Sequence, residues 1–283
     1  MSDHAGQRSP DEIDSEMVRY YAARASEYDD WYLRRGRYSH GYINDRAWTS
    51  DLDTAAAWLS SRPLRGRIAE LAAGTGWWSQ ILASKGQLTL YDAAPEPLAI
   101  ARDRLAAAGL VAEIEIRDAW AEPDDVVDCL FAGFWISHVE RRRLDDFFEL
   151  TGRWLVPGGL LAFIDSRPDP ESGALDHRPP QDDVQVRKLG DGSSFHVRKV
   201  FYEPPDLESA MRRAGFDNVE VTTTSRFFVL GSACRGSGRF LQHHRPRRRE
   251  GRQDVDAAEQ IREVPFEHAL QSSEVAPPGR RGR

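Results

Sequence analysis

The strongest constraint on the fold is a change of rhythm near residue 67, after which short apolar runs alternate with amphipathic stretches. Helical periodicity predicts helices over residues 77–84, 95–108 and 140–155. The strand candidates around them span residues 67–72, 88–92, 112–116, 126–131 and 160–165. Strands and helices that alternate in this way form βαβ units with buried parallel strands. The sequence therefore predicts an α/β fold with a doubly wound, mostly parallel sheet.

The alternation ends after residue 165, and a different arrangement follows. Two strand candidates, 184–189 and 194–202, flank a Gly-Asp-Gly-Ser turn, so a hairpin insertion is expected near residues 166–202. A predicted helix over 205–214 then precedes strands over 218–224 and 226–232. These last two strands are expected to complete a seven-stranded sheet as an antiparallel pair.

The N-terminal part is rich in aromatic residues and predominantly helical. Residues 11–35 have a helical pattern, in one or two pieces, residues 37–48 are predicted to form an aromatic loop, and residues 49–61 a short helix. The predicted organisation is a disordered N-terminus (1–10), a helical lid (11–62), a Rossmann-like core (63–234) and a disordered basic tail (235–283).

Charge and composition narrow the class of partner. The 283 residues carry a net charge of −7, and the tail after residue 234 has eleven arginines against seven acidic residues, so residues 1–234 carry −11. An acidic body argues against a broad phosphate-binding face for nucleic acid. Two cysteines, no apolar run of membrane-spanning length and no apolar leader segment favour a cytoplasmic protein. Neither a disulfide framework nor a metal site is expected.

A glycine-containing turn after the first predicted strand is the strongest functional motif. Residues 70–76 read Glu-Leu-Ala-Ala-Gly-Thr-Gly and lead into a helix. Glycines let the backbone turn tightly and approach a ligand closely. Asp92 follows Gly74 by 18 residues at the end of the next strand, where an acid can accept hydrogen bonds from ribose hydroxyls or cap the following helix. The pair indicates a cofactor that contains adenosine.

The motif departs from those of dinucleotide and nucleoside triphosphate sites. In a Gly-x-Gly-x-x-Gly pattern the third glycine would stand at Ser79, and Trp77 and Trp78 would crowd a pyrophosphate. The chain also lacks the Gly-x-x-x-x-Gly-Lys-Ser/Thr loop. An NAD-type oxidoreductase therefore stays an alternative, but not the favoured one.

Four segments, taken in order, resemble the class I S-adenosylmethionine-dependent methyltransferases of the small-molecule type. They are residues 70–76, Leu90-Tyr91-Asp92, Arg117-Asp118-Ala119 and the Trp-Leu-Val-Pro-Gly-Gly-Leu-Leu run at 154–161. The resemblance extends over residues 67–232. One departure is Ala72, where the family usually has glycine. Residues 132–135 read Ala-Gly-Phe-Trp rather than the Asp/Asn-Pro-Pro-Tyr/Phe tetrad of amide-type DNA methyltransferases, which favours a small acceptor.

The resemblance implies a set of residues that bind S-adenosylmethionine. Glu70 would anchor the methionine end, Asp92 would hold the ribose hydroxyls, and Asp118 would accept from the adenine amino group. The other cofactor-binding candidates are Ala72, Gly74, Gly76, Ala93, Ala119, Trp120 and Phe134. In small-molecule members a tyrosine of the N-terminal helix commonly closes over the sulfonium, which makes Tyr21 and Tyr28 candidates for the lid.

His138, in the segment after the fourth predicted strand, is the candidate catalytic residue. Its ordinary pKa near ~6.5 suits proton transfer if the acceptor must lose a proton. A structural role for His138 in the loop is the alternative, and Asp165 and His40 are weaker candidates for a base. Candidate acceptor-pocket residues are Arg37, Tyr38, Trp48, Trp135 and Arg167.

The sequence thus predicts methylation of a small-molecule acceptor at O, N or C by a monomer or homodimer. The alternatives left open are an NAD-type oxidoreductase on a Rossmann-like fold and a non-catalytic S-adenosylmethionine-binding protein.

Overall fold

A computed structural model describes residues 9–237 of the chain. These residues fall within one compact unit. The predicted disordered N-terminus, up to residue 8, and the predicted basic tail from residue 238 onward lie outside the described residues. None of the helices within residues 9–237 has the length and apolarity required to cross a membrane.

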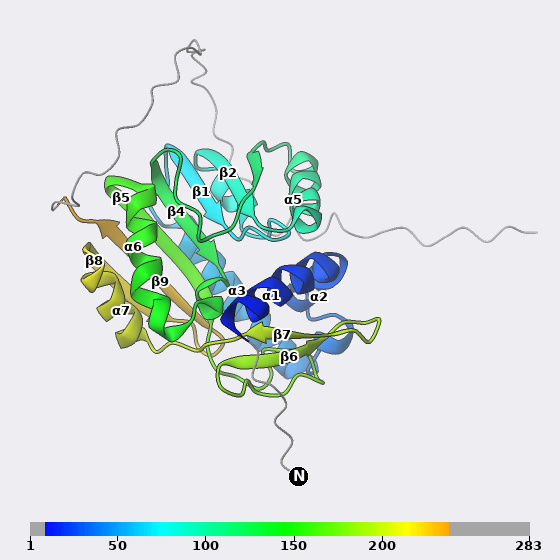
Figure 1. Ribbon diagram of the computed structural model, residues 1–283. Coiled ribbons are helices and arrows are strands. Elements are labelled where there is room, and N and C mark those ends of the chain that lie inside the picture. The colour runs from blue at the N-terminus through cyan, green and yellow to red at the C-terminus, as the bar shows by residue number, and fades with distance from the viewer. Residues whose placement is uncertain (1–8, 238–283) are drawn as a thin grey trace, which may run out of the picture. The chain divides into compact units, whose positions relative to one another are not determined.

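A seven-stranded sheet forms the centre of the fold (Figure 1). Its strand order is β3-β2-β1-β4-β5-β9-β8. The parallel strands are β1 (Arg67–Leu71), β2 (Gln87–Asp92), β3 (Glu113–Ile116), β4 (Val127–Gly133) and β5 (Leu155–Ser166). The antiparallel strands β8 (Phe216–Thr223) and β9 (Phe228–Arg235) complete the edge beside β5. The predicted α/β fold with a mostly parallel sheet is confirmed.

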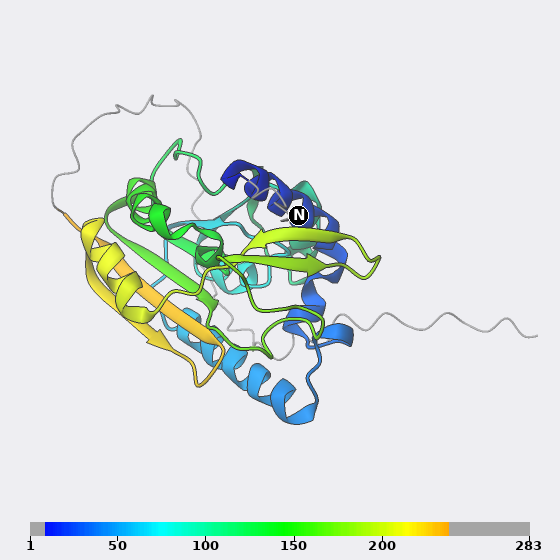
Figure 2. The ribbon, with the colours of Figure 1, turned by 60° about the horizontal axis from the view of Figure 1, so that its bottom comes forward.

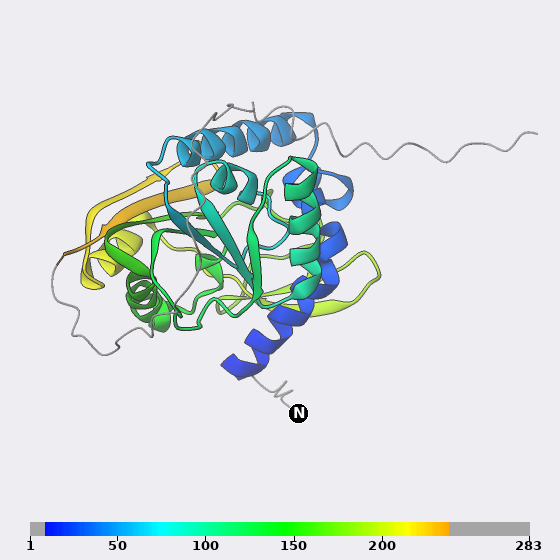
Figure 3. The same cartoon turned by 90° about the horizontal axis from the view of Figure 1, so that it is seen from above.

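Helices cover both faces of the sheet (Figure 3). On one face lie α3 (Tyr42–Ser60), α4 (Ser79–Ala83) and α5 (Pro95–Ala107), and on the other α6 (Leu144–Trp154) and α7 (Pro204–Arg213). The buried side of α6 contributes Phe147, Phe148 and Trp154, which are at most 1% exposed. The sheet is therefore a middle layer. Because helices cover both of its faces, a ligand can reach it only at the ends of its strands.

The lid and the hairpin lie together beside the strand ends. The lid contains α1 (Pro10–Arg24), α2 (Tyr28–Tyr32) and the 3₁₀ turns Ala25–Glu27 and Gly36–Tyr38. The hairpin consists of β6 (Val184–Lys188) and β7 (Ser194–Arg198), paired antiparallel. Figure 2 shows the hairpin alongside α1, and β7 contacts α1 directly.

Helix α3 corrects the prediction for residues 37–48. The predicted aromatic loop becomes helical from Tyr42 onward, seven residues before the predicted helix start at 49. Gly41, at φ +85°, turns the chain into the helix. Trp48 is fully buried and packs on Phe227 and Phe228, so tertiary contact stabilises a turn whose aromatic composition gave no helical signal.

The strand order indicates at which edge of the sheet a crevice should form. Strand β1 pairs with β2 on one side and with β4 on the other, so successive connections leave the sheet in opposite directions there. In open α/β sheets a crevice forms at this switch point, outside the carboxyl ends of the strands. The 3₁₀ turn Ile136–His138 follows β4 at this edge. The predicted helix over 140–155 begins later, at Leu144, after a 3₁₀ turn at Arg141–Arg143.

Candidate active site

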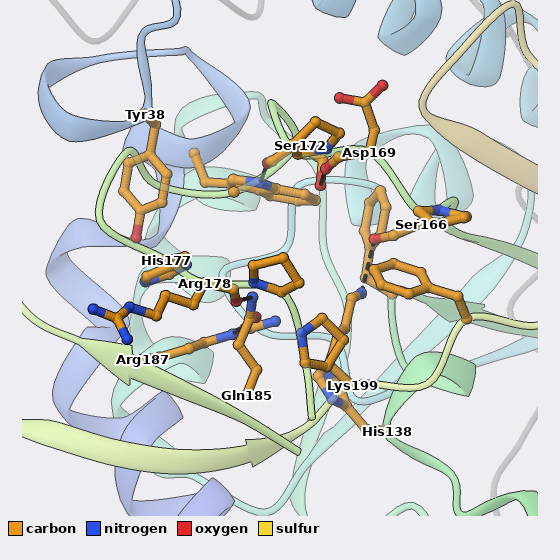
Figure 4. Close-up of a pocket in the computed structure, with 18 of the residues that line it drawn as sticks. Tyr38, His138, Ser166, Asp169, Ser172, His177, Arg178, Gln185, Arg187 and Lys199 are labelled. Carbon is orange, nitrogen blue, oxygen red and sulfur yellow. Dashed lines mark hydrogen bonds between the residues drawn. The ribbon is translucent and has the colours of Figure 1, made fainter. Parts of the chain in front are cut away.

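Two cavities meet at the carboxyl ends of the parallel strands. The smaller one, about 90 Å³, is lined by the loops after β1, β2, β3 and β4 and by α1. The larger one, about 320 Å³, lies among the lid, residues 166–180 and the hairpin (Figure 4). Four residues line both cavities: Tyr21, Tyr28, Phe134 and His138. We call these four residues the junction.

Gly74 and Asp92 come together in the smaller cavity, as the sequence predicted. Asp92 Oδ2 accepts a hydrogen bond from the Gly74 N–H at 2.9 Å, and Asp92 Oδ1 accepts one from Ala94 N–H at 2.9 Å. Gly74 has φ +55°, and a Cβ built on it would meet no atom within 4 Å. Burial raises the pKa of Asp92, although its backbone hydrogen bonds oppose that shift. The carboxylate therefore ties the glycine turn to the end of β2.

Two non-glycine residues of the smaller cavity have a left-handed backbone. Ala72 has φ +51° and Phe134 has φ +57°. A residue with a Cβ pays a steric cost in this region, and such strain clusters at functional sites. The left-handed backbone at Ala72 is a conformation that glycine adopts without steric cost. This would explain a glycine at this position in the family that the chain resembles.

The remaining wall of the smaller cavity comes from the loops after β2 and β3. Ala93, Asp118, Ala119 and Trp120 all line it, together with Asp14 of the lid. Asp118 Oδ1 accepts a hydrogen bond from Trp120 N–H at 2.7 Å. With Asp92, the described lining of this cavity therefore includes three carboxylates, beside small residues and aromatic rings.

Glu70 and Gly76 do not line either cavity. Glu70 is 1% exposed and accepts a hydrogen bond from Ser79 Oγ at 2.5 Å. Burial raises the pKa of Glu70 to about 8. A Cβ on Gly76 would approach the Cβ of Ala101 to 2.7 Å, so this glycine lets the turn pack against α5.

The two tryptophans after the glycine turn leave the smaller cavity open. The Trp77 ring stacks on Tyr32 at 4.1 Å between centroids. Trp78 packs beside Phe131 and beneath Gly133, where a Cβ would come within 2.8 Å of its ring. Both side chains are thus part of the core below the lid.

At the junction, His138 is held on both sides. Its Nδ1 lies 2.6 Å from the carbonyl oxygen of Arg198, and its Nε2 lies 2.6 Å from the hydroxyl of Tyr21. Because a carbonyl only accepts, Nδ1 carries the hydrogen and Nε2 accepts from Tyr21. Burial, then the nearby cations Lys199 and Arg187, hold the pKa of His138 well below 6.5. The imidazole is therefore neutral with a defined tautomer.

The predicted acceptor-pocket residues divide between several places. Tyr38 lines the larger cavity and Trp135 the smaller one, whereas Arg37, Trp48 and Arg167 line neither. The alternative bases are occupied elsewhere. His40 Nε2 donates to the carbonyl of Gly173 at 2.9 Å. Asp165 accepts from the N–H groups of Ser137 at 2.8 Å and Ser166 at 2.6 Å.

Sequence reasoning missed three cationic residues and one histidine of the larger cavity. Arg24, Arg187, Lys199 and His177 line it, from α1, β6, the segment after β7 and the loop before β6. No motif marks them, because they come from four separate segments that only the folded chain brings together. Among residues 9–237, no group of three or more metal-ligating side chains gathers at either cavity or elsewhere.

Comparison with known proteins identifies the family of the chain. Residues 68–159 match a family model described as a methyltransferase domain. Ubiquinone/menaquinone biosynthesis C-methyltransferase UbiE of Yersinia enterocolitica is 30% identical over 172 residues, which cover 54% of this chain and 67% of the relative. UbiE of Proteus mirabilis is 29% identical, with 55% of this chain and 68% of the relative covered. The chain thus spans about two thirds of the length of these relatives.

Solved structures extend the match beyond the central domain. A complex of DhpI with SAH has a TM-score of 0.65 and 28% identity, and covers 81% of this chain and 99% of that one. A DhpI-SAM-HEP complex has a TM-score of 0.64 and 29% identity. Human N-acetylserotonin methyltransferase, at 14% identity and a TM-score of 0.55, shares the fold. The chain therefore belongs to the class I S-adenosylmethionine-dependent methyltransferases.

Proposed function

We propose that this methyltransferase binds S-adenosylmethionine in the smaller cavity and methylates a small-molecule acceptor held in the larger one. The observation that carries the proposal is the junction, whose four residues line both cavities. A methyl donor and an acceptor must approach within van der Waals contact for in-line displacement. Two cavities that share a wall of four side chains provide such an approach.

The residues of the smaller cavity suit the cofactor. Asp92 keeps lone pairs for ribose hydroxyls, and the bare backbone at Gly74 leaves space beside the cavity. Asp118 lies at the rim for the adenine amino group, with Ala93, Ala119 and Trp120 around it. Glu70 acts from behind the cavity wall, on the methionine end through an intervening water, and Gly76 acts by allowing the turn.

The lid would keep water from the reaction. Among its ties to the rest of the fold are two hydrogen bonds: Thr75 Oγ1 of the core donates to Asp29 at 2.7 Å, and the Gly190 N–H of the hairpin donates to Glu27 at 3.0 Å. Tyr21 and Tyr28 are the residues that the lid contributes to the junction, and their rings lie 5.9 Å apart. When bound, the cofactor supplies a methyl group on a sulfonium, and aromatic faces stabilise such a cation.

His138 would serve as the base for an acceptor that loses a proton. Its neutral Nε2 faces Tyr21, so a proton from the acceptor passes to the Tyr21 oxygen as the Tyr21 hydrogen moves to His138. The carbonyl of Arg198 then stabilises the charged ring through Nδ1. An acceptor that is already deprotonated needs no such step.

The dimensions of the larger cavity favour a small acceptor. Its volume of about 320 Å³ is at the lower end of the range for small-molecule sites. The acidic body of the chain is consistent with an acceptor other than nucleic acid. A cytoplasmic location and a monomeric or homodimeric state are part of the same proposal.

A pair of neighbouring hairpin substitutions tests the proposal. Gln185 lines the larger cavity, whereas Val186 is 48% exposed, because successive strand residues point to opposite faces. We expect Gln185→Trp to abolish methyl transfer to a panel of small acceptors, followed by mass spectrometry, while the dissociation constant for S-adenosylhomocysteine stays unchanged. Val186→Trp is the control and should keep both. Normal turnover by Gln185→Trp would show that acceptors do not occupy the larger cavity.

A further inference from the structure

The larger cavity has an excess of positive charge. Within the described part of the chain, Arg24, Arg178, Arg187 and Lys199 line it, against a single acid, Asp169. That acid is already engaged, because it accepts hydrogen bonds from Arg226 at 2.7 and 3.1 Å. The charge at the cavity wall therefore differs in sign from that of the molecule as a whole.

Two of these cations are buried without an acidic partner. Arg24 is 4% exposed, and its guanidinium lies over the rings of Tyr28 at 4.5 Å and Tyr38 at 5.4 Å. Arg187 is 8% exposed and donates to the Gln185 side-chain oxygen at 3.0 Å and to the Tyr21 hydroxyl at 3.2 Å. Within residues 9–237, no carboxylate lies within 4.0 Å of either guanidinium.

Two other buried cations near the site, in contrast to Arg24 and Arg187, each have a carboxylate within 4.0 Å. Arg198, 5% exposed, has Asp14 at 3.1 Å and Glu140 at 3.5 Å. Lys199 donates to the hydroxyls of Ser137 and Ser166, both at 2.9 Å, and has Asp165 at 3.8 Å. Removing a charge from water without a partner costs several kcal/mol. Arg24 and Arg187 are therefore the two cations for which a ligand would offset that cost.

Unpartnered hydrogen-bond donors surround the same space (Figure 4). The hydroxyl of Tyr38 is buried and has no hydrogen-bond partner among the residues that the structure describes, and the same holds for His177 Nε2. His177 Nδ1 accepts from Ala174 N–H at 3.4 Å, so Nε2 carries the hydrogen. Buried polar atoms are nearly always satisfied by protein, water or ligand. Together with the two guanidinium groups, these donors form a site that suits a ligand with several oxygen acceptors.

We infer that the acceptor of this methyltransferase carries a doubly charged oxyanion, bound in the larger cavity between Arg24 and Arg187. This inference rests on the proposed function and assigns its substrate class. The charge is borne either by one tetrahedral group of the phosphate type or by two carboxylates, and both present oxygen atoms to the same donors. Because Arg187 contacts Tyr21 of the junction, the anionic end lies next to the point of methyl transfer.

The first test uses the unmodified protein saturated with S-adenosylhomocysteine. Thermal shift and calorimetry compare inorganic phosphate, succinate and acetate at equal ionic strength and pH 8, with glycerol as a neutral control. We expect phosphate or succinate to stabilise the protein at millimolar concentration, with acetate at least tenfold weaker and glycerol without effect. Phosphate alone indicates a tetrahedral group, and succinate alone indicates two carboxylates. Equal effects of all three anions, or none, would overturn the inference.

The second test removes each cation while keeping a flexible, unbranched side chain. Arg24→Met and Arg187→Met should each weaken binding of the effective dianion by roughly tenfold or more, since charged hydrogen bonds are lost. They should leave the free protein as stable as before or more stable, because a buried unpaired charge is removed. Arg153→Met is the control, because Arg153 is an exposed partner of Glu122 at 2.9 Å. Unchanged dianion binding in both variants would contradict the inference.

The failure of this inference and that of the proposed function are distinguishable. Tight S-adenosylhomocysteine binding, together with methyl transfer to neutral acceptors only, would refute the oxyanion and leave the proposed function intact. Absence of S-adenosylhomocysteine binding would refute the proposed function, whatever the anions do.

Discussion

The two cavities that meet at the junction differ in charge and in origin. Asp14, Asp92 and Asp118 line the smaller cavity, mostly from loops that follow parallel strands. Arg24, Arg187 and Lys199 line the larger one, from the lid, the hairpin and the segment after it. A cofactor with a positive sulfonium and ribose hydroxyls suits the first, and an anion suits the second. In the proposed function, the donor site thus belongs to the α/β core, and the acceptor site to the lid and the hairpin that are added to it.

This contrast predicts that the two cavities respond independently to substitution. Variants in the smaller cavity should change cofactor affinity and leave anion binding unaffected, and variants such as Arg187→Met should do the reverse. His138 lines both cavities. Its substitution should lower the methylation rate and leave the affinities for the cofactor and for the anion unchanged.

The largest effect is expected at His138. His138→Ala should lower the methylation rate by roughly 10²–10⁴-fold for an acceptor that must lose a proton, with S-adenosylhomocysteine affinity unchanged. Because burial and Lys199 hold the pKa of His138 well below 6.5, the wild-type rate should show no inflection near that pH. The measurement is a pH–rate profile under single-turnover conditions. His138→Gln, whose amide still donates and accepts, is the control, and full activity in that variant would limit His138 to a structural role.

A large pH-dependent effect on stability is expected at Glu70, behind the smaller cavity. Its pKa is raised from 4.5 to about 8, so it releases its proton more readily in the unfolded chain. Stability from this group is present below pH 4.5 and is lost as the pH rises toward 8. Glu70→Gln should remove that loss, and its advantage in unfolding free energy should grow to about 2–5 kcal/mol across this interval. Urea unfolding at several pH values measures it, and a constant difference would show that Glu70 is ionised throughout.

A substitution at Asp92 tests whether cofactor binding in the smaller cavity is independent of anion binding in the larger one. Asp92→Ala should weaken S-adenosylhomocysteine binding by about 1–3 kcal/mol, since it removes charged hydrogen bonds and frees the Gly74 turn. Calorimetry gives the affinity, and the stabilisation by dianions in the same variant serves as the internal control. If dianion binding fell in parallel, the two cavities would not be independent.

The smallest effect is expected at Ala72. Replacing it with glycine should stabilise the free protein by about 0.5–1 kcal/mol, because the left-handed backbone at φ +51° no longer carries a Cβ. The neighbouring Ala73, whose φ is not positive, provides the matched control, and Ala73→Gly should destabilise. Thermal unfolding distinguishes them, and destabilisation by both would mean that the Ala72 methyl group is held by packing.

Local patterns in the sequence were sufficient to predict much of the smaller cavity, because most of its lining residues stand directly after strands. Hydrophobic alternation located β1 and β2, and parallel strands end at one edge of a sheet, so Gly74 and Asp92 were predictable neighbours. The same reasoning placed Asp118 and Phe134 at that edge. It also named Glu70 and Gly76 as cofactor-binding residues, but neither of them lines the smaller cavity.

Only the tertiary structure decided the larger cavity. Arg24 and Arg187 are 163 positions apart, and no spacing rule links a lid helix to a hairpin strand. Likewise, the helical state of residues 42–48 depends on packing of Trp48 against β9, a contact invisible to local propensity. Periodicity records which face of an element is buried, whereas the charge that two distant segments place around one space depends on how those faces pack.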